Sequence, residues 1–246
     1  MVPEQQLEQG RAAAGGPGAQ AAWPYVDKDD PWSSHSRIAA WLARLPPGTR
    51  VLDVGAATGT LGRMCAGRGF AITGVEPNPA WAEVARRWYT AMRCGTIDAI
   101  GDAALSGHDV VVCADVLEHL ADPEATLRRL VALQPEGSTF VVSVPNVANL
   151  WVRLQLLRGR FDYTDRGILD RTHLRFFTRR TLAGLLARAG LRPVALQATP
   201  IPLNLVHPWF RTVPGRLVHR ALAYATSRLP TLLGYQFVVR ATKRPE

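Results

Sequence analysis

The chain of 246 residues has few cysteines, few lysines and no long hydrophobic run. Without a run of about 18 apolar residues, we expect no membrane-spanning helix. The N-terminus does not show a basic segment followed by an apolar core, so we expect no secretory signal. The three cysteines, Cys65, Cys94 and Cys113, lack the spacing of a zinc knuckle. Their odd number and their places inside predicted elements favour reduced core thiols in a cytoplasmic protein.

Positive charge is concentrated in the second part of the chain. Residues 1–150 contain 12 basic and 16 acidic residues, whereas residues 151–246 contain 17 and 4. Only Lys28 and Lys243 are lysines, so the basic side chains are nearly all arginine, a bias that genome composition alone can produce. The alternative is an anionic partner for the second part, such as a phosphate-bearing substrate, a lipid surface or nucleic acid.

A glycine-rich turn follows the first predicted strand. Val51, Leu52 and Val54 form a short apolar strand, and glycines at 55, 59 and 62 then lead into a helix-like run. Glycine lets the backbone approach a ligand closely, and the start of a helix presents unpaired N–H groups. Asp53 lies at the end of this strand, where a buried carboxylate needs a cation or hydrogen-bond donors. The turn therefore predicts a ligand-binding site.

Strands alternate with helices along most of the chain. We expect strands at 51–54, 70–75, 92–94, 109–115, 138–144, 191–197 and 235–242. The near-continuous apolar run at 109–115 is typical of a central parallel strand that is buried on both faces. The pattern predicts an α/β fold with a doubly wound, mostly parallel sheet of seven strands. Ligands bind such sheets at the carboxyl ends of the strands.

Three segments lie outside this alternation. Residues 1–22 are poor in large apolar side chains and are expected to be a disordered tail, which leaves 23–246 as a single domain. Residues 147–178 begin with a helical pattern, continue into an arginine-rich loop and are expected to form a substrate lid. Residues 201–233 are expected to insert an amphipathic helix before the last strand. Its predicted apolar face consists of Leu217, Ala221, Leu222 and Tyr224. This helix could cover the core, which is the plainer interpretation, join a dimer or rest on an anionic membrane.

The glycine spacing separates two classes of cofactor. A dinucleotide site needs G-x-G-x-x-G, but counting from Gly55 places Ala57 third and Thr60 sixth, so that fingerprint is absent. The pattern that remains is D-x-G-x-A-x-G, followed by Glu76 at the end of the second strand. An acid at that place can bind both hydroxyls of a ribose.

These residues resemble the class I S-adenosylmethionine (SAM)-dependent methyltransferases. The resemblance covers about residues 35–200, with 51–62 similar to the first motif of that family and 109–119 similar to its fourth-strand motif. Segments 114–120, 143–146 and 169–178 are similar to the branch that includes ubiquinone-type O-methyltransferases and many enzymes that modify glycans or natural products. Ala57 stands where the family often has glycine. The resemblance implies a Rossmann-like methyltransferase fold, in which the last of the seven strands is antiparallel, and SAM as the cofactor.

The resemblance also implies a set of cofactor-binding residues. Gly55 and Gly59 would pack against the methionine part, and Asp53 would help to hold its ammonium group through the turn. Glu76 would bind the ribose, and Asp98 the adenine amino group. The full expected set is Asp53, Gly55, Ala56, Gly59, Glu76, Pro77, Asp98 and Ala114. The plain alternatives are a turn cap for Asp53, a helix cap for Glu76 and a solvated loop acid for Asp98, with Asp102 as a nearby competitor.

The expected catalytic residues are His119, Asp115 and His173. A hydroxyl nucleophile must lose a proton, which calls for a general base near neutral pH. His119 follows the fourth strand at the mouth of the cleft and is the first candidate; its alternative is a helix-face histidine bonded to a carbonyl or to Glu118. Asp115, four residues earlier, is expected to share a helical face with His119 and to orient it. Because Glu118 and His119 alone are too few ligands, no metal site is predicted.

His173 lies in a loop that by resemblance folds over the substrate side. The alternative is a structural histidine that pins this loop through Asp170 or Thr172.

We therefore expect a SAM-dependent methyltransferase that acts on a hydroxyl oxygen of a small metabolite, a sugar or a lipid-linked acceptor. The alternatives are N- or C-methylation of a small molecule, a non-catalytic SAM-fold scaffold and an NAD-dependent enzyme. Nucleic acid is disfavoured because residues 113–116 read Cys-Ala-Asp-Val instead of the Asn/Asp-Pro-Pro-aromatic run of base-amino methyltransferases. The basic second part leaves open an anionic acceptor, a homodimer, and contact with the inner face of the membrane by a cytoplasmic protein.

Overall fold

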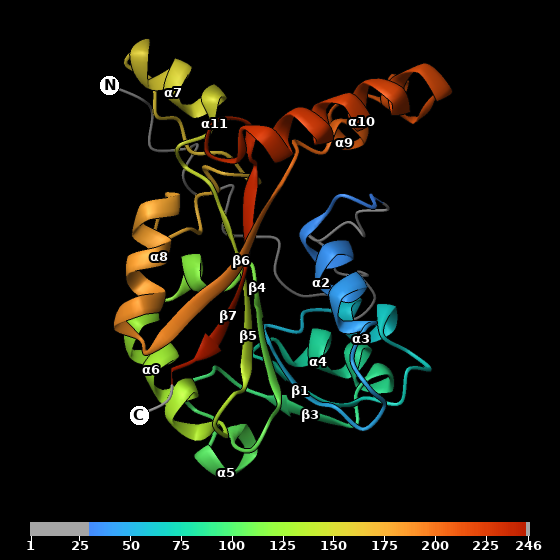
Figure 1. The fold of residues 1–246 in the computed structure, drawn as a ribbon, viewed down its shortest axis with the longest axis vertical. Helices are drawn as coiled ribbons and strands as arrows, with labels where there is room; N and C mark the ends of the chain where they lie inside the picture. Colours follow the sequence, from blue (N-terminus) through green and yellow to red (C-terminus); the bar gives the residue numbers. More distant parts are fainter. Residues whose placement is uncertain (1–29, 245–246) are drawn as a thin grey trace, which may run out of the picture.

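The computed structural model describes residues 30–244, so the predicted tail at 1–22 lies outside the described range. The described chain is built around a seven-stranded sheet with the order β3-β2-β1-β4-β5-β7-β6 (Figure 1). Its strands are β1 (Arg50–Val54), β2 (Ala71–Glu76), β3 (Ala91–Cys94), β4 (Val110–Ala114), β5 (Thr139–Pro145), β6 (Leu191–Thr199) and β7 (Gln236–Lys243). All seven agree with predicted strands to within two residues at each end.

Strand directions confirm the predicted fold class. β1 is parallel to β2 and β4, β3 is parallel to β2, and β5 is parallel to β4, whereas β7 is antiparallel to both β5 and β6. After β3, at one edge of the sheet, the chain returns to its centre and forms β4 beside β1. The strand order reverses at this point, and ligands of open α/β sheets bind at such a switch point.

Helices cover both faces of the sheet. α2 (Ser34–Leu42), α3 (Thr60–Met64) and α4 (Pro79–Ala85) lie on one face, and α6 (Pro123–Leu133) and α8 (Arg179–Arg188) lie on the other (Figure 1). Ile38 and Leu61 pack with β1 and β4 in one apolar cluster, whereas Leu127 and Leu186 pack with β4 and β5 in another. The short helix α5 (Asp102–Leu105) was not predicted.

Two of the helices begin at side-chain caps. The Ser33 hydroxyl accepts a hydrogen bond from the N–H of Ser36 at the start of α2. Thr178 forms a capping box with Thr181 at the start of α8. Such caps satisfy N–H groups that have no partner within the helix, so they define where each helix begins.

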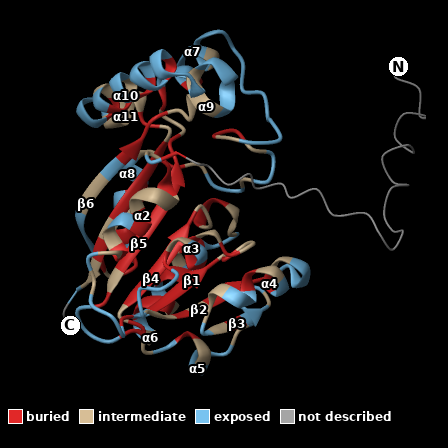
Figure 2. Cartoon of the chain, turned by 90° about the vertical axis from the view of Figure 1, so that its right-hand side faces the viewer, coloured by how far each residue is buried: buried red, intermediate tan, exposed pale blue. Residues whose placement is uncertain are grey.

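The two insertions form helices at one end of the molecule, which we call the helical end (Figures 1 and 2). It consists of α7 (Leu150–Leu157), α9 (Leu203–Val206), the 3-10 turn η3 (Pro208–Arg211), α10 (Val213–Arg228) and α11 (Pro230–Leu233). Asn149, the N-cap of α7, donates from Nδ2 to the carbonyl oxygen of Gly234, just after α11, at 2.8 Å. This bond ties the two insertions together.

The predicted apolar face of α10 is wrong. Leu217, Ala221 and Tyr224 are exposed and Leu222 is only half-buried; the buried positions are Gly215, His219, Ala223 and Thr226. A Cβ atom on Gly215 would lie 2.4 Å from the carbonyl oxygen of Trp209. Gly215 therefore lets the helix approach η3 closely, and most of the large apolar residues of the helix face outward.

The expectation of three core thiols is wrong for one of them. Cys65 and Cys113 are buried, but Cys94 is exposed. It lies at the end of β3, the edge strand, whose last two residues are both exposed. Burial raises the pKa of Cys113 to about 12 and that of Cys65 to about 11, so both remain thiols at neutral pH.

Candidate cofactor and active site

The glycine turn between β1 and α3 has the left-handed backbone that its sequence predicts. Gly55 and Gly59 have φ of 75° and 89°. A Cβ on Gly55 would lie 2.5 Å from Cγ2 of Val116, and one on Gly59 would lie 3.0 Å from Cα of Ala85. Only glycine therefore fits both the backbone and the packing here. Ala57 adopts φ of 47°, a left-handed conformation that costs a non-glycine residue about 1 kcal/mol.

The Glu76 carboxylate connects the end of β2 to this turn. It accepts from the N–H of Ala57 at 2.8 Å and from the N–H of Asn78 at 2.9 Å, one bond to each oxygen. The side chain is buried. Burial raises the pKa of Glu76, and these two backbone bonds oppose that effect. Because each carboxylate oxygen has two acceptor positions, each one retains a position for a ligand hydroxyl.

Asp53 is buried beneath the turn and bonded to Tyr89. The Tyr89 hydroxyl donates to Oδ2 of Asp53 at 2.6 Å and accepts from the N–H of Gly62 at 3.3 Å. Burial raises the pKa of Asp53 to about 7; the Tyr89 bond opposes this rise, and the charge of Glu76 adds to it. Sequence reasoning did not identify Tyr89, because it lies 36 residues after Asp53 and belongs to no motif.

The remaining cofactor candidates line the carboxyl edge of the sheet. Ala56 and Ala114 are buried, and Pro77 and Asp98 are exposed. Asp102, the predicted competitor of Asp98, forms an ion pair with Arg129 at 2.6 Å. Arg129 also donates to the carbonyl oxygens of Ile97 and Ile100, so it holds the loop that carries Asp98.

Asp115 does not share a helical face with His119, and that prediction is wrong. Asp115 has φ of 58°, a left-handed conformation that ends β4, and the 3-10 turn η2 starts only at Leu117. Its carboxylate accepts from three elements, namely Ser34 of α2 at 3.2 Å, Ser143 of β5 at 2.6 Å and Gln236 of β7 at 2.8 Å. Asp115 thus ties together the strand ends around the switch point, at the cost of local strain.

His119 is held by the loop before α8. Its Nδ1 lies 3.3 Å from both the carbonyl oxygen and the hydroxyl oxygen of Thr172. The Thr172 hydroxyl donates to Asp170, so toward His119 it can only accept, as the carbonyl does. Nδ1 therefore carries the proton, and Nε2 carries the lone pair that a general base needs. Thr172 and Asp170 provide the support for His119 that was predicted for Asp115.

His173 reaches the same place from the same loop. Its Nδ1 donates to the carbonyl oxygen of Ile168 at 3.1 Å, which again leaves a lone pair on Nε2. The imidazole of His173 thus pins the loop through Ile168, and the backbone N–H of His173 also donates to the carbonyl oxygen of Asp170 at 3.1 Å. Burial lowers the pKa of His173, with a further decrease from His119, so this imidazole is neutral at pH 7.

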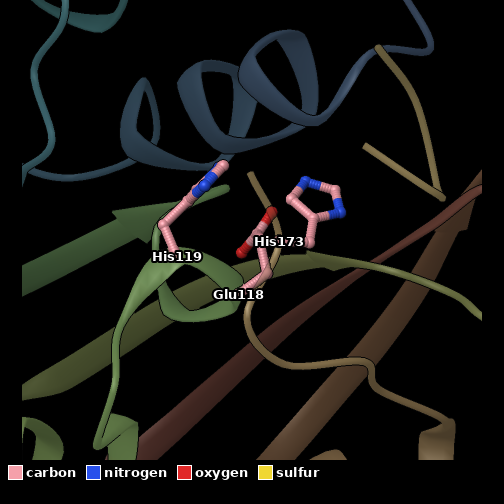
Figure 3. Close-up of side chains that lie close together, drawn as sticks. All are labelled: Glu118, His119 and His173. Carbon is pink, nitrogen blue, oxygen red and sulfur yellow. The ribbon is translucent and has the colours of Figure 1, made fainter. Parts of the chain in front are cut away.

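Glu118, His119 and His173 together form what we call the histidine cluster (Figure 3). The two imidazole centroids are 4.9 Å apart, and the Glu118 carboxylate lies between the rings in this view. One ligand atom from each residue lies within 4.8 Å of the others. The backbone carbonyl of Glu118 accepts from the N–H groups of Leu174 and Arg175, which fixes the loop against η2. Neutral imidazoles and a carboxylate can serve as bases or as ligands of a divalent cation.

The residues at the carboxyl ends of β1 and β2 fit an adenosyl cofactor. The turn is too tight for side chains and exposes backbone, and the buried Glu76 carboxylate is held with one free acceptor position on each oxygen. Two acceptors on one carboxylate match the paired hydroxyls of a ribose.

Comparison with a known family settles the family of the chain. A family model described as "Methyltransferase domain" matches residues 32–196. The chain belongs to this family. The match confirms the resemblance to SAM-dependent methyltransferases. It also confirms the Rossmann-like methyltransferase fold and SAM as the cofactor.

Curated relatives are methyltransferases of ubiquinone synthesis. The ubiquinone biosynthesis O-methyltransferase of Idiomarina loihiensis is 32% identical over 112 residues, which cover 43% of this chain and 46% of that protein. The protein of the same name from Xanthomonas axonopodis pv. citri is 29% identical over 182 residues, which cover 70% of this chain and 73% of that protein. The match thus spans about half the length of the first of these relatives.

Solved structures with the same fold include two methyltransferases. A SAM-dependent methyltransferase from Archaeoglobus fulgidus has a TM-score of 0.57 and 19% identity, and the match covers 85% of this chain and 92% of that one. Magnesium protoporphyrin IX methyltransferase from Synechocystis PCC 6803, with bound S-adenosylhomocysteine (SAH), has a TM-score of 0.58 and 16% identity. The match covers 86% of this chain and 83% of that one. At these identities the similarity shows a shared fold.

Proposed function

We propose that this protein transfers the methyl group of SAM to a hydroxyl oxygen of a small molecule, a sugar or a lipid-linked acceptor. The observation that carries the proposal is the histidine cluster, which places a supported imidazole with a free Nε2 beside the switch point of the sheet. The curated relatives named as O-methyltransferases support the same reaction class.

When bound, the cofactor supplies a methyl group on a sulfonium, which is already activated for transfer. The chain's own contribution is to position the acceptor, exclude water and remove one proton. His119 Nε2 takes that proton from the acceptor hydroxyl, and the Thr172 acceptors stabilise the positive charge that the ring gains. Neutral His173 lies 4.9 Å away, measured between ring centroids, and adds no positive charge that would oppose this step.

The histidine cluster has a second candidate role as a three-ligand site for a divalent cation, favoured by its three converging ligand atoms. Dialysis against EDTA distinguishes the two roles. Under the proposed mechanism, the dialysed protein keeps its full methyl-transfer rate. A rate that falls and returns only with added Mg²⁺, Mn²⁺ or Zn²⁺ would assign the cluster to the metal role instead.

The reaction is tested with purified full-length protein, methyl-labelled SAM and an extract of source cells from which the gene has been deleted. We expect label in a product that mass spectrometry shows to be heavier than its precursor by one CH₂ and to carry the new methyl on oxygen. A new methyl on nitrogen or carbon would leave the cofactor assignment intact and contradict the proposed atom. SAH binding without any labelled product would favour the scaffold alternative.

A further inference from the structure

The helical end carries most of the exposed large apolar side chains of residues 30–244. Among residues 30–244, every such side chain except Val194 lies in one of the two insertions. The helices and η3 expose Leu150, Trp151, Leu154, Leu156, Leu157, Leu205, Val206, Trp209, Val213, Leu217, Val218 and Tyr224. Single exposed apolar side chains are ordinary, whereas a group gathered at one end of a molecule marks an interaction surface.

Helix α7 shows this most clearly. Apart from Arg153 and Gln155, all of its residues are apolar, yet only Val152 is buried. Leu157 is 82% exposed. A helix that is apolar on all sides is normally enclosed by the protein or by lipid. Within residues 30–244, α7 keeps most of its apolar side chains exposed, so they are available for contact with a lipid or protein surface.

The charge of this end is of one sign. Residues 147–160 and 201–233 contain seven arginines and neither aspartate nor glutamate. Within residues 30–244, none of these arginines forms an ion pair. Arg153, Arg158 and Arg211 donate instead to backbone carbonyls. Helices rich in arginine, leucine and tryptophan are typical of segments that lie in the interface of an anionic membrane.

Both insertions lie at the same end of the molecule, so they can contact the same surface. Both views place α7 and α10 at the same end of the molecule (Figures 1 and 2). The bond from Asn149 to Gly234 holds them there, and Asn146 adds a second bond to the same carbonyl at 2.9 Å. Within residues 30–244, no helix is long and apolar enough to cross a bilayer, so contact would be with one surface of it.

We propose that α7, α9, η3 and α10 form a docking face for an anionic phospholipid bilayer, with their apolar side chains in the interface and their arginines on headgroup phosphates. Charge favours this occupant over a second copy of the chain. A symmetric dimer through this face would oppose two sets of arginines that have no acidic partners. At an anionic surface each of these arginines adds an electrostatic attraction, which decreases with added salt.

The proposal is tested by floating the full-length protein with phosphatidylcholine vesicles and with vesicles containing equal parts of phosphatidylcholine and phosphatidylglycerol. We expect the protein to float with the anionic vesicles only and to be released by high salt. The double variants Leu217→Ser with Tyr224→Ser, and Arg216→Glu with Arg220→Glu, should each reduce the bound fraction at least about fivefold. The matched controls Val194→Ser and Arg192→Glu, at exposed positions of β6, should bind like the unaltered protein.

SAH affinity, measured on the same samples, shows that each variant is folded, because the cofactor site lies at the carboxyl ends of β1 and β2 and does not involve these side chains. Flotation that is absent, or equal for both kinds of vesicle, would overturn the proposal. A concentration-dependent dimer that Leu217→Ser with Tyr224→Ser abolishes, in a protein that does not float, would assign this face to a second copy instead.

Discussion

The carboxyl ends of β1 and β2 and the helical end orient their side chains in opposite ways. At the strand ends, Asp53 and Glu76 are buried polar groups whose oxygens accept from Tyr89, Ala57 and Asn78. At the helical end, large apolar residues face outward and small ones face inward. The polar groups of the first region thus find partners within the chain, whereas the second region leaves its apolar side chains exposed. This difference is the basis for proposing a small-cofactor site in the first region and a docking face in the second.

The separation of chemistry from cofactor binding is tested by His119→Ala. We expect methyl transfer to fall by about 100-fold or more, because the proton acceptor is lost, while SAH affinity stays within about twofold. Labelled-methyl incorporation and calorimetry measure the two quantities. His207→Ala, an exposed histidine of the helical end, is the control and should keep both values. Unchanged transfer by His119→Ala would remove the histidine cluster from the reaction.

Glu76→Ala tests whether the buried carboxylate at the end of β2 binds the cofactor. We expect the dissociation constant for SAH to rise by about 100-fold, since two charge-assisted hydrogen bonds of about 1.5 kcal/mol or more each are lost. The control is Glu83→Ala, an exposed acid that pairs with Arg86 on the same segment. Thermal unfolding of both variants checks that the bond to Ala57 is not required for folding. A rise of less than about threefold would contradict the ribose role of Glu76.

Asp53→Asn tests whether the buried acid imposes a pH-dependent cost on folding. In the folded protein its pKa is about 7, against an ordinary value of 3.8, so the folded state binds more protons than the unfolded state between these values. The free energy of unfolding of the unaltered protein therefore falls as pH rises through this window. An amide oxygen still accepts from Tyr89 but does not ionise.

We accordingly expect the Tm of Asp53→Asn, relative to the unaltered protein, to be higher at pH 8 than at pH 5 by at least about 3 °C. Scanning calorimetry at the two pH values measures this difference. Asp98→Asn, an exposed acid in the same region, should show no such dependence. A difference that is constant with pH would mean that Asp53 is ionised at no cost in the folded protein.

Local sequence signals were sufficient for the sheet and for the glycine turn. The apolar runs of β4 and β5 identify strands buried on both faces, and the glycines at 55 and 59 identify a turn in which a side chain would clash. The spacing from Gly55 to Glu76 is set by one strand–helix–strand unit, so it also can be read from the sequence.

Contacts between distant segments could not be predicted in this way. Tyr89 reaches Asp53, and Thr172 reaches His119, across 36 and 53 residues, and no local pattern specifies either pair. Asp115 was assigned to a helix because its spacing from His119 is helical, but its left-handed backbone depends on donors from three other elements. The inward face of α10 was assigned to its large residues, whereas close packing against η3 selects the small ones.

Hydrogen exchange of the full-length protein with and without SAH tests most directly whether the two regions are separate. Bound SAH should protect the backbone amides of 55–62, 76–78 and 95–100, where the turn, Glu76 and the Asp98 loop meet the cofactor. Exchange in α7 and α10 should not change. Protection that is absent from the glycine turn, or is centred on α7 and α10, would contradict the assignment of the cofactor to the ends of β1 and β2.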